Sequence, residues 1–398
     1  MIHHGNLTIT KENAKLYAGI IEVTGDLRIS QGASLTAPVL AKTGSVVLSQ
    51  GASLTAPVLA EVTGSVDLGQ GASLTAPVLA KTGSVVLREG ASLTAPVLAE
   101  VTGYVVLREG ASLTAPVLAK TGYVVLSRGA SLTAPVLAEV TGYVVLREGA
   151  SLTAPVLAEV TGYVVLREGA SLTAPVLAKT GYVVLREGAS LTAPVLAKTG
   201  SVVLSRGASL TAPVLAKTGY VVLSQGASLT APVLAKTGSV DLREGASLTA
   251  PVLAEVTGYV DLSQGASLTA PVLAKTGSVD LSQGASLTAP VLATVNGKPF
   301  KVPVLEHIDA KILAAIQSGG GKLEMDAWHT CGTTHCRAGW AIHLCGDEGY
   351  ALEAITNSET AGTLIYAASR PGLPTPNFRA SNKDAWADLH ACANASVP

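Results

Sequence analysis

Apolar and polar residues alternate over short stretches in the first three quarters of the chain. In residues 34–37 the apolar Leu35 and Ala37 alternate with hydroxyl residues, and Val46 and Leu48 alternate in the same way with residues 45 and 47. A period of two is typical of a β-strand with one buried face. Gly or Pro recurs every few residues, so no stretch is long enough for a helix of ~10 residues. The pattern predicts short strands joined by tight corners.

These stretches belong to a tandem repeat. The decamer GASLTAPVLA occurs 14 times without change, at spacings of 19 or 20 residues. A fixed period near 20 is typical of a solenoid in which each repeat forms one turn. We predict a mainly β fold, a roughly triangular parallel β-solenoid of 19–20-residue turns, about 65 Å long. The sides of its first turn are residues 34–37, 39–41 and 45–48, with Leu40 pointing inward.

The repeat ends near residue 302, and the chain beyond it has a different composition. All four cysteines and all three tryptophans lie there, and its formal charge is −4 against +3 for the preceding residues. Apolar residues from Leu305 to Ile316 have helical spacing. We predict a cap with an irregular first turn at 1–31, a β-solenoid at 32–302 and a small α-helical C-terminal domain at 303–398. Further helices are predicted at 336–344, 347–356, 359–369 and 383–393, the last with Ser381 as N-cap.

Two motifs resemble segments of uncharacterised bacterial and phage proteins. The repeats follow an L-x-A-P-x-L…V-x-G-x-V-x-L pattern over roughly residues 6–295. Residues 328–340 follow a W-x-x-C-G-T-x-x-C-x-A-G-W pattern. The resemblance implies a β-solenoid with a helical C-terminal domain, and it implies no activity. Copies this similar also indicate recent duplication or consensus design.

Charge and hydropathy narrow the classes of partner. The formal net charge is −1, which gives no electrostatic basis for binding nucleic acid. No apolar run approaches the ~18 residues of a membrane-spanning helix, and the first residues lack the apolar core of a secretory signal. We expect no nucleic-acid or membrane partner and a cytoplasmic location. Nucleotide-binding and triad motifs are absent, which favours a non-enzymatic role.

The cysteine- and histidine-rich segment allows four interpretations. One is packing, since a buried cysteine behaves as a small apolar residue. A second is a disulfide or redox pair between Cys331 and Cys336. A third is a zinc site, the one cofactor for which the sequence offers ligands. Its candidate ligands are His329, Cys331, His335 and Cys336.

The fourth interpretation is a nucleophile. Cys336 is expected at a helix N-terminus, which favours the thiolate, and Thr333 or Thr334 is expected to cap that helix. His343 lies two turns further along the same face and is the candidate base. In all the interpretations that use the thiols, Cys331, His335 and Cys336 are expected to converge near the start of the helix.

Two outward surfaces of the predicted solenoid are candidates for binding. The Ser-Leu-Thr segments place parallel hydroxyl columns on one side, similar to the Thr-x-Thr arrays of ice-binding solenoids, with Thr133, Thr153 and Thr173 at its centre. On another side, tyrosine replaces serine in five successive turns, each followed by an outward valine. These residues are Tyr104, Tyr123, Tyr143, Tyr163, Tyr182, Val106, Val125, Val145, Val165 and Val184. An exposed apolar patch with polar flanks is typical of a partner contact.

We interpret the chain as a structural or binding scaffold that acts through self-association or a protein partner on the Tyr/Val surface. The first alternative is a thiol- or metal-dependent activity in the C-terminal domain. The second is ice binding through the Ser-Leu-Thr surface.

Overall fold

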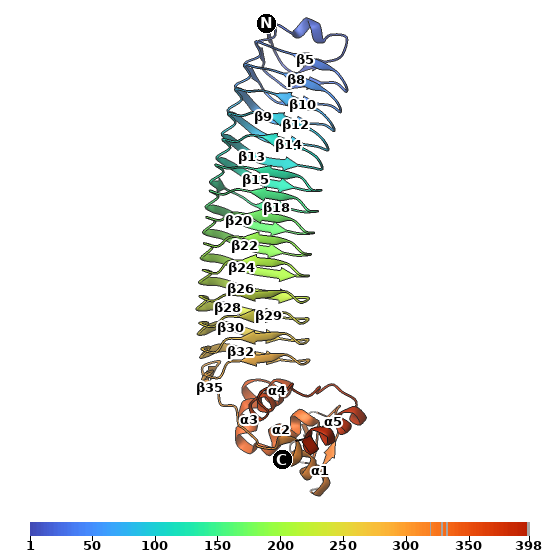
Figure 1. Cartoon of the computed structure of the whole chain (residues 1–398), viewed down its shortest axis with the longest axis vertical. Helices are drawn as coiled ribbons and strands as arrows, with labels where there is room; N and C mark the ends of the chain where they lie inside the picture. Colours follow the sequence, from blue (N-terminus) through green and yellow to red (C-terminus); the bar gives the residue numbers. More distant parts are fainter. Residues whose placement is uncertain (319, 328, 332, 396–398) are drawn as a thin grey trace. The chain divides into compact units, whose positions relative to one another are not determined.

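The computed structural model describes residues 1–318, 320–327, 329–331 and 333–395, with only the backbone described at 329–331 and 395. The chain divides into two compact units, Met1–Leu215 and Ala216–Pro398. The first unit consists of solenoid turns, and the second contains further turns and the helical region (Figure 1).

Each repeat in the first unit forms one turn of a parallel β-solenoid, as the sequence predicts. Equivalent residues of successive turns pair in register at a spacing of 19 or 20 residues, for example Ser73 with Ser92 and with Ser53. The insertion of one residue is absorbed beside the Thr-Gly corner, where the register shifts between Thr82 and Ser84. The Ser-Leu-Thr strands are β5 (Ser34–Thr36), β8 (Ser53–Thr55), β10 (Ser73–Thr75), β12 (Ser92–Thr94), β14 (Ser112–Thr114), β16 (Ser131–Thr133), β19 (Ser151–Thr153), β21 (Ser171–Thr173), β23 (Ser190–Thr192) and β25 (Ser209–Thr211).

The remaining strands of the first unit belong to one long sheet. In most turns a single strand runs through the Thr-Gly corner into the Val-Leu side. The strands are β1 (Ile2–His3), β2 (Leu7–Ile9), β3 (Glu22–Val23), β4 (Leu27–Ile29), β6 (Lys42–Thr43), β7 (Val46–Leu48), β9 (Glu61–Leu68), β11 (Lys81–Leu87), β13 (Glu100–Leu107), β15 (Lys120–Leu126), β17 (Glu139–Val140), β18 (Val144–Leu146), β20 (Glu159–Leu166), β22 (Lys179–Leu185) and β24 (Lys198–Ser205). In the first turn a 3-10 helix, η1 (Ala14–Tyr17), stands in place of a Ser-Leu-Thr strand.

The predicted faces are confirmed, and one predicted side is not a strand. Leu35, Ala37, Val46 and Leu48 are buried, and Leu40 points inward. Residues 39–41, however, form no strand, because the chain turns at Pro38-Val39 and the N–H of Leu40 donates to the carbonyl of Ala37 at 3.2 Å. Proline cannot donate to a ladder, so this stretch becomes a corner. The strand on the second side begins later, at Lys42.

Two kinds of glycine shape the corners. The glycine of each Thr-Gly lies against the same residue of the preceding turn, so that a Cβ on Gly83 would collide with the carbonyl oxygen of Gly64. The glycine that opens each decamer has a positive φ, for example +64° at Gly90 and +73° at Gly149. Each position therefore requires glycine, one for close approach and the other for its backbone conformation.

The corner before each decamer changes conformation within the first unit. From Arg128 onward the residue before the glycine also has a positive φ of about 53°, whereas in the earlier turns only the glycine does. The Ser-Leu-Thr strands divide at the same place, into a five-stranded sheet from β5 to β14 and another from β16 to β25. The long sheet does not divide there, since β13 pairs with β15 and β15 with β18.

The second unit holds the last turns of the solenoid and the helices. Its Ser-Leu-Thr strands are β27 (Ser228–Thr230), β29 (Ser247–Thr249), β31 (Ser267–Thr269) and β33 (Ser286–Thr288). Its other strands are β26 (Lys217–Ser224), β28 (Lys236–Leu242), β30 (Glu255–Leu262), β32 (Lys275–Leu281), β34 (Thr294–Val295), β35 (Lys298–Pro299), β36 (Lys322–Leu323), β37 (His329–Cys331) and β38 (Thr334–His335). The helices are α1 (Ile308–Ser318), α2 (Arg337–Leu344), α3 (Gly346–Ile355), α4 (Ser358–Ser369) and α5 (Asn382–Ala395), each within a few residues of a predicted helix. Ser381 accepts a hydrogen bond from the N–H of Asp384, as its predicted role as N-cap of α5 requires.

The start of α4 covers the backbone of the last solenoid turns. The side chain of Thr360 accepts a hydrogen bond from the N–H of Leu281 at 2.7 Å, and Glu359 accepts one from the N–H of Gln283 at 2.9 Å. An open sheet edge would leave these N–H groups without a protein partner. The helical region therefore supplies side-chain acceptors to the part of this turn beyond Lys275 and Thr276, the two residues that pair with β34.

Candidate interaction surface

The five predicted tyrosines form one outward column on the long sheet of the first unit. Tyr104 pairs with Tyr123 in the ladder, and Tyr163 pairs with Tyr182. The rings of Tyr143 and Tyr163 are stacked, with centroids 4.8 Å apart, and those of Tyr123 and Tyr143 are 4.4 Å apart. Tyr182, at the end of the column, is 56% exposed. The rings of Tyr123, Tyr143 and Tyr163 thus support one another, and the column stays partly open to solvent.

A hollow of about 470 Å³ lies beside this column. The half-buried Val106, Val125 and Val145 line it together with Tyr143 and Tyr163. The structure therefore brings together five of the ten residues that the sequence predicts for partner binding. Of the other five, Tyr104, Tyr123 and Val165 lie in the same turns beside the hollow, and Tyr182 and Val184 lie in the next turn.

Arginines form a third column, which the sequence analysis did not identify. Because side chains alternate along a strand, Tyr104, Val106 and Arg108 all point to the same side of their turn. Arg108 and Arg147 line the hollow, and in the turn between them Ser127 takes the place of arginine. The smaller side chain accounts for the hollow. The signal was present in the sequence as a Ser-Arg-Gly corner among Arg-Glu-Gly corners.

Some of the arginines around the hollow form ion pairs and others do not. Arg128 lies 3.5 Å from Glu148 and 4.0 Å from Glu109. No ion pair joins Arg108 or Arg147 to an acidic group in the part of the chain that the structure describes. The hollow thus combines an apolar floor with a rim that holds the Arg128–Glu148 ion pair and two further guanidinium groups, those of Arg108 and Arg147.

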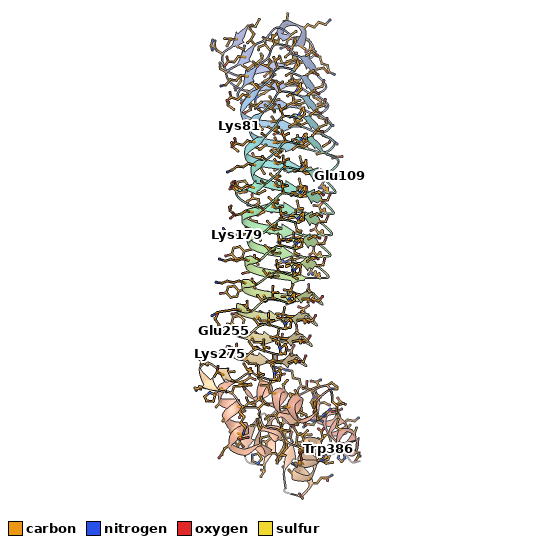
Figure 2. The ribbon with its side chains drawn as sticks, turned by 60° about the vertical axis from the view of Figure 1, so that its left-hand side comes forward. Lys81, Glu109, Lys179, Glu255, Lys275 and Trp386 are labelled. Atoms are coloured by element: carbon orange, nitrogen blue, oxygen red, sulfur yellow. The ribbon has the colours of Figure 1, made fainter. Side chains whose placement is uncertain are left out.

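The charged column at the Thr-Gly corner differs in this respect. Lys81 lies 2.9 Å from Glu100, and Lys179 lies 2.8 Å from Glu159. Figure 2 shows Lys81 and Lys179 on one side of the first unit and Glu109 on the opposite side. Exposed pairs of this kind contribute little to stability, but they neutralise one another. This column offers a partner little net charge.

The predicted hydroxyl columns are present on the Ser-Leu-Thr side. Thr133, Thr153 and Thr173 are exposed and pair in register through β16, β19 and β21. The array is interrupted between β14 and β16, where the sheet divides. The first unit therefore holds two separate arrays of hydroxyl groups, each on five strands.

In the helical region, Cys336 does not have the environment of a reactive thiolate. It is buried, and burial raises the pKa of its thiol, which outweighs the lowering by the N–H groups of Gly339 and Ala338. The helix N-terminus lowers the pKa of the thiol as expected, but desolvation is the larger effect, so the net shift does not favour the thiolate. Cys336 is itself the N-cap of α2 and accepts from the N–H of Gly339 at 3.4 Å, so neither Thr333 nor Thr334 caps that helix.

His343, the candidate base, belongs to an aromatic cluster. Its ring stacks on that of His335 with centroids 4.8 Å apart, and its Nδ1 lies 2.7 Å from the hydroxyl of Tyr350. The ring of Trp340 packs edge-on against both histidines. Packing against these neighbouring rings accounts for the position of His343.

Two of the four candidate zinc ligands lie outside the described side chains. The backbone of His329 and Cys331 forms β37, which pairs with β38, but the positions of their side chains are not described. His335 and Cys336 are both buried. No group of three or more metal-ligating side chains occurs within the described residues. The convergence of Cys331 with His335 and Cys336 stays a prediction.

A buried ionic network in the helical region was not predicted from the sequence. The guanidinium of Arg337 donates to Asp309 at 2.7 Å and to the hydroxyl of Tyr366 at 3.0 Å, and it also donates to Asp388. Arg370 donates to the second oxygen of Asp309 at 2.8 Å. The network joins α1, α2, α4 and α5, and burial raises the pKa of Tyr366. With every group paired, its role is structural.

Comparison with family models, with curated proteins and with solved structures found no match to this chain. Within the described residues, no helix combines the length and the hydropathy that crossing a bilayer requires.

Proposed function

We propose that the protein is a binding scaffold that holds a protein partner on the surface formed by the tyrosine, valine and arginine columns of the first unit. The observation that carries the proposal is the hollow beside the stacked tyrosines, which has valines as its floor and Arg108 and Arg147 at its rim. An exposed apolar patch with polar residues at its edge and enriched in tyrosine and arginine is typical of a surface that binds a protein partner.

The stacked tyrosines favour binding because little conformational entropy is lost. The rings of Tyr123, Tyr143 and Tyr163 already rest on one another in the unbound chain. Tyrosine offers a large amphipathic contact area with few rotatable bonds, so ordering it costs less than ordering a flexible side chain. The repeated columns allow one partner to make the same contact in several turns.

The arginine column favours an acidic partner over a second copy of the chain. Arg108, Arg147, Arg167 and Arg186 adjoin the valine column in four turns. Two copies meeting face to face on this surface would bring guanidinium groups together, which is unfavourable. A partner segment with carboxylates and aromatic or aliphatic side chains would complement both the rim and the floor.

A second apolar column provides a matched control. The valines of the Pro-Val corners are exposed in every turn, including Val117, Val136, Val156, Val176 and Val195. They differ from the tyrosines in showing no change of residue type along the chain. Loss of apolar surface there should not affect a partner bound at the tyrosines.

The proposal is tested with two fivefold variants of the full chain and a random copolymer of glutamate and tyrosine as probe. We expect Tyr→Ser at the five tyrosines to weaken binding at least about tenfold, and we expect salt to weaken binding to the unmodified protein. Serine occupies the same position in other turns, so the fold accepts it. Val→Ser at the five control valines should leave binding unchanged. Equal loss in both variants, or no binding to the unmodified protein, would contradict the proposal, and a rise in mass by light scattering would indicate self-association instead.

A further inference from the structure

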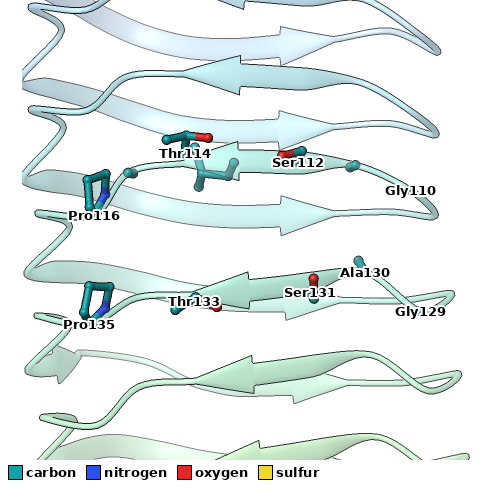
Figure 3. Close-up of a pocket in the computed structure, with 12 residues that line it drawn as sticks. Gly110, Ser112, Thr114, Pro116, Gly129, Ala130, Ser131, Thr133 and Pro135 are labelled. Carbon is teal, nitrogen blue, oxygen red and sulfur yellow. The ribbon is translucent and has the colours of Figure 1, made fainter.

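The division of the Ser-Leu-Thr strands creates an opening between two turns of the first unit. The opening between β14 and β16, here termed the seam, has a volume of about 550 Å³. Figure 3 shows Ser112 and Thr114 on one side of it and Ser131 and Thr133 on the other. The long sheet behind the seam stays paired from β13 through β15 to β18, so the two turns separate on one side only.

The seam lacks hydrogen bonds that neighbouring turns make. Between β12 and β14, Gly90 donates to Glu109 at 2.8 Å, Ala95 donates to Thr114 at 3.0 Å and Ser112 donates to Ala91 at 2.9 Å, all through backbone groups. The groups equivalent to these across the seam are the N–H groups of Gly110, Ala115 and Ser131 and the carbonyls of Arg128, Thr133 and Ala111. No hydrogen bond joins them across the seam in the described part of the chain. Each edge therefore presents both donors and acceptors.

A mismatch of corner conformations accompanies the seam. Arg128 has a φ of +53°, whereas Glu109, at the same place in the preceding turn, does not have a positive φ. The core is also less covered at this point, since Leu113 is 8% exposed and its counterpart Leu93 only 1%. The turns on each side of the seam thus pair regularly with one another, whereas the two turns that face each other across the seam pack less closely.

We infer that the seam is a binding site for an extended peptide, which adds a strand between β14 and β16. Addition of a strand to an open sheet edge is a common mode of peptide recognition, in which main-chain hydrogen bonds supply affinity. Here two edges face each other and run parallel, so one inserted strand satisfies both. The site does not depend on the tyrosine surface and so goes beyond the proposed scaffold function.

The lining determines the chemistry of the peptide. The inward side of an inserted strand meets Leu113 and the neighbouring alanines, so it takes an aliphatic residue. The outward side lies between the hydroxyl columns of Ser112–Thr114 and Ser131–Thr133, so it takes small polar residues. A paired strand has no place for proline, which lacks the N–H donor. The occupant is a peptide that alternates small polar and aliphatic residues, as the Ser-Leu-Thr segment itself does.

Binding requires the seam to widen. Some facing Cα atoms of β14 and β16 lie within 8 Å of each other. Paired strands are about 4.8 Å apart, and a strand between two others needs about 9.6 Å. The seam is therefore open beyond pairing distance and short of full width. The closed long sheet provides the hinge about which the remaining opening takes place.

The first measurement is amide hydrogen exchange on the full chain without peptide. We expect the amides of Gly110, Ala115 and Ser131 to exchange at least about tenfold faster than those of Gly90, Ala95 and Ser112, which occupy the same positions in closed turns. Equal protection at the two sets of positions would show that the seam is closed in solution and would overturn the inference. Protection of the seam that rises with protein concentration would indicate that a second copy occupies it, and would also overturn it.

The second measurement adds the peptide acetyl-Gly-Ala-Ser-Leu-Thr-Ala-amide. We expect saturable slowing of exchange at the three seam amides. A peptide N-methylated at leucine should cause no slowing, because it lacks the backbone N–H with which leucine would donate to the edge of the seam. Binding of both peptides alike, or no slowing with either, would overturn the inference. The fivefold Tyr→Ser variant should bind the peptide normally, which separates this outcome from that of the proposed function.

A covalent clasp gives an independent check. Oxidation of the Ser112→Cys/Ser131→Cys variant should close the seam and abolish peptide binding, with recovery on reduction. The Ser92→Cys/Ser112→Cys variant links two strands that are already paired, so it should bind the peptide in both redox states. Retention of binding by the oxidised seam variant would contradict insertion between β14 and β16.

Discussion

The solenoid turns and the helical region are stabilised in different ways. In the turns, the same few residue types recur, and each inward leucine or valine packs against its equivalents above and below. In the helical region, single residues without equivalents hold several helices together, above all Arg337, which is only 1% exposed. In a repeat array, stability is distributed as a sum of similar terms between neighbours. The helical region concentrates its stability in a few contacts.

The largest effect is expected where stability is most concentrated. Arg337→Met removes one partner of the buried Asp309 and leaves Arg370 and the hydroxyl of Tyr366 as its remaining partners. Breaking a buried ion pair from one side costs about 3–5 kcal/mol. We expect a loss of this size in the unfolding free energy of the helical region, followed by tryptophan fluorescence, since all three tryptophans lie beyond residue 302.

Arg108→Met is the control for this substitution, because Arg108 is exposed and lies in a solenoid turn. It should leave the tryptophan transition unchanged. A similar small effect of both substitutions would mean that the buried network does not stabilise the helical region as the comparison requires.

A smaller and graded effect is expected within the turns. Leu93→Ala opens a cavity in a closed turn and should cost about 2–5 kcal/mol. Leu113→Ala makes the same change beside the seam, where the side chain is already partly exposed, and should cost less. Urea unfolding followed by circular dichroism measures both. Equal losses would show that the turns beside the seam are as well packed as the others.

The helical region should also respond to alkaline pH through Cys336. Burial raises the pKa of this thiol above its ordinary value, so the unfolded chain ionises first as pH rises. The resulting stabilisation is fully present below about pH 8.5 and is lost as pH rises through the folded pKa. We expect the unfolding free energy of the helical region, followed by tryptophan fluorescence, to fall between pH 8 and pH 10. Cys336→Ala should reduce the slope of this fall. A slope unaffected by the substitution would assign the pH dependence to another group.

The smallest effect concerns the corners. Glu148, Glu168 and Glu187 have positive φ values of 53°, 54° and 56°, which glutamate adopts at a cost and asparagine tolerates better. Asparagine at these three positions should raise the melting temperature, because each substitution removes backbone strain of roughly 1 kcal/mol or less. Asparagine at Glu89 and Glu109, whose φ is not positive, should give no gain. A gain at both sets would mean that backbone strain is not its source.

Most of the fold could be predicted because its signals are local. The alternation in residues 34–37 assigns Leu35 to the core and Thr36 to the surface, since side chains on a strand alternate strictly. The helical spacing after residue 303 likewise predicts each helix to within a few residues. The tyrosine column followed from the repeat, because the one-residue difference between turns falls at the Thr-Gly corner and leaves equivalent residues above one another. Residues 39–41 were predicted as a separate side of the turn, but they form no strand, and the next strand begins at Lys42.

Other features were decided only by the tertiary structure. The same Arg-Glu-Gly sequence adopts one corner at Glu109 and another at Glu148, because the conformation of a corner depends on the turn against which it stacks. The seam lies where these two corner conformations meet, between turns whose strands are identical in sequence. Arg337 contacts Asp309, 28 residues away in the sequence, and Tyr366, 29 residues away. Cys336, the residue before Arg337, is buried in the same packed region, and this burial raises the pKa of its thiol. Periodicity determines which face a side chain points to, whereas desolvation and the fit between neighbouring turns arise only once distant residues are packed together.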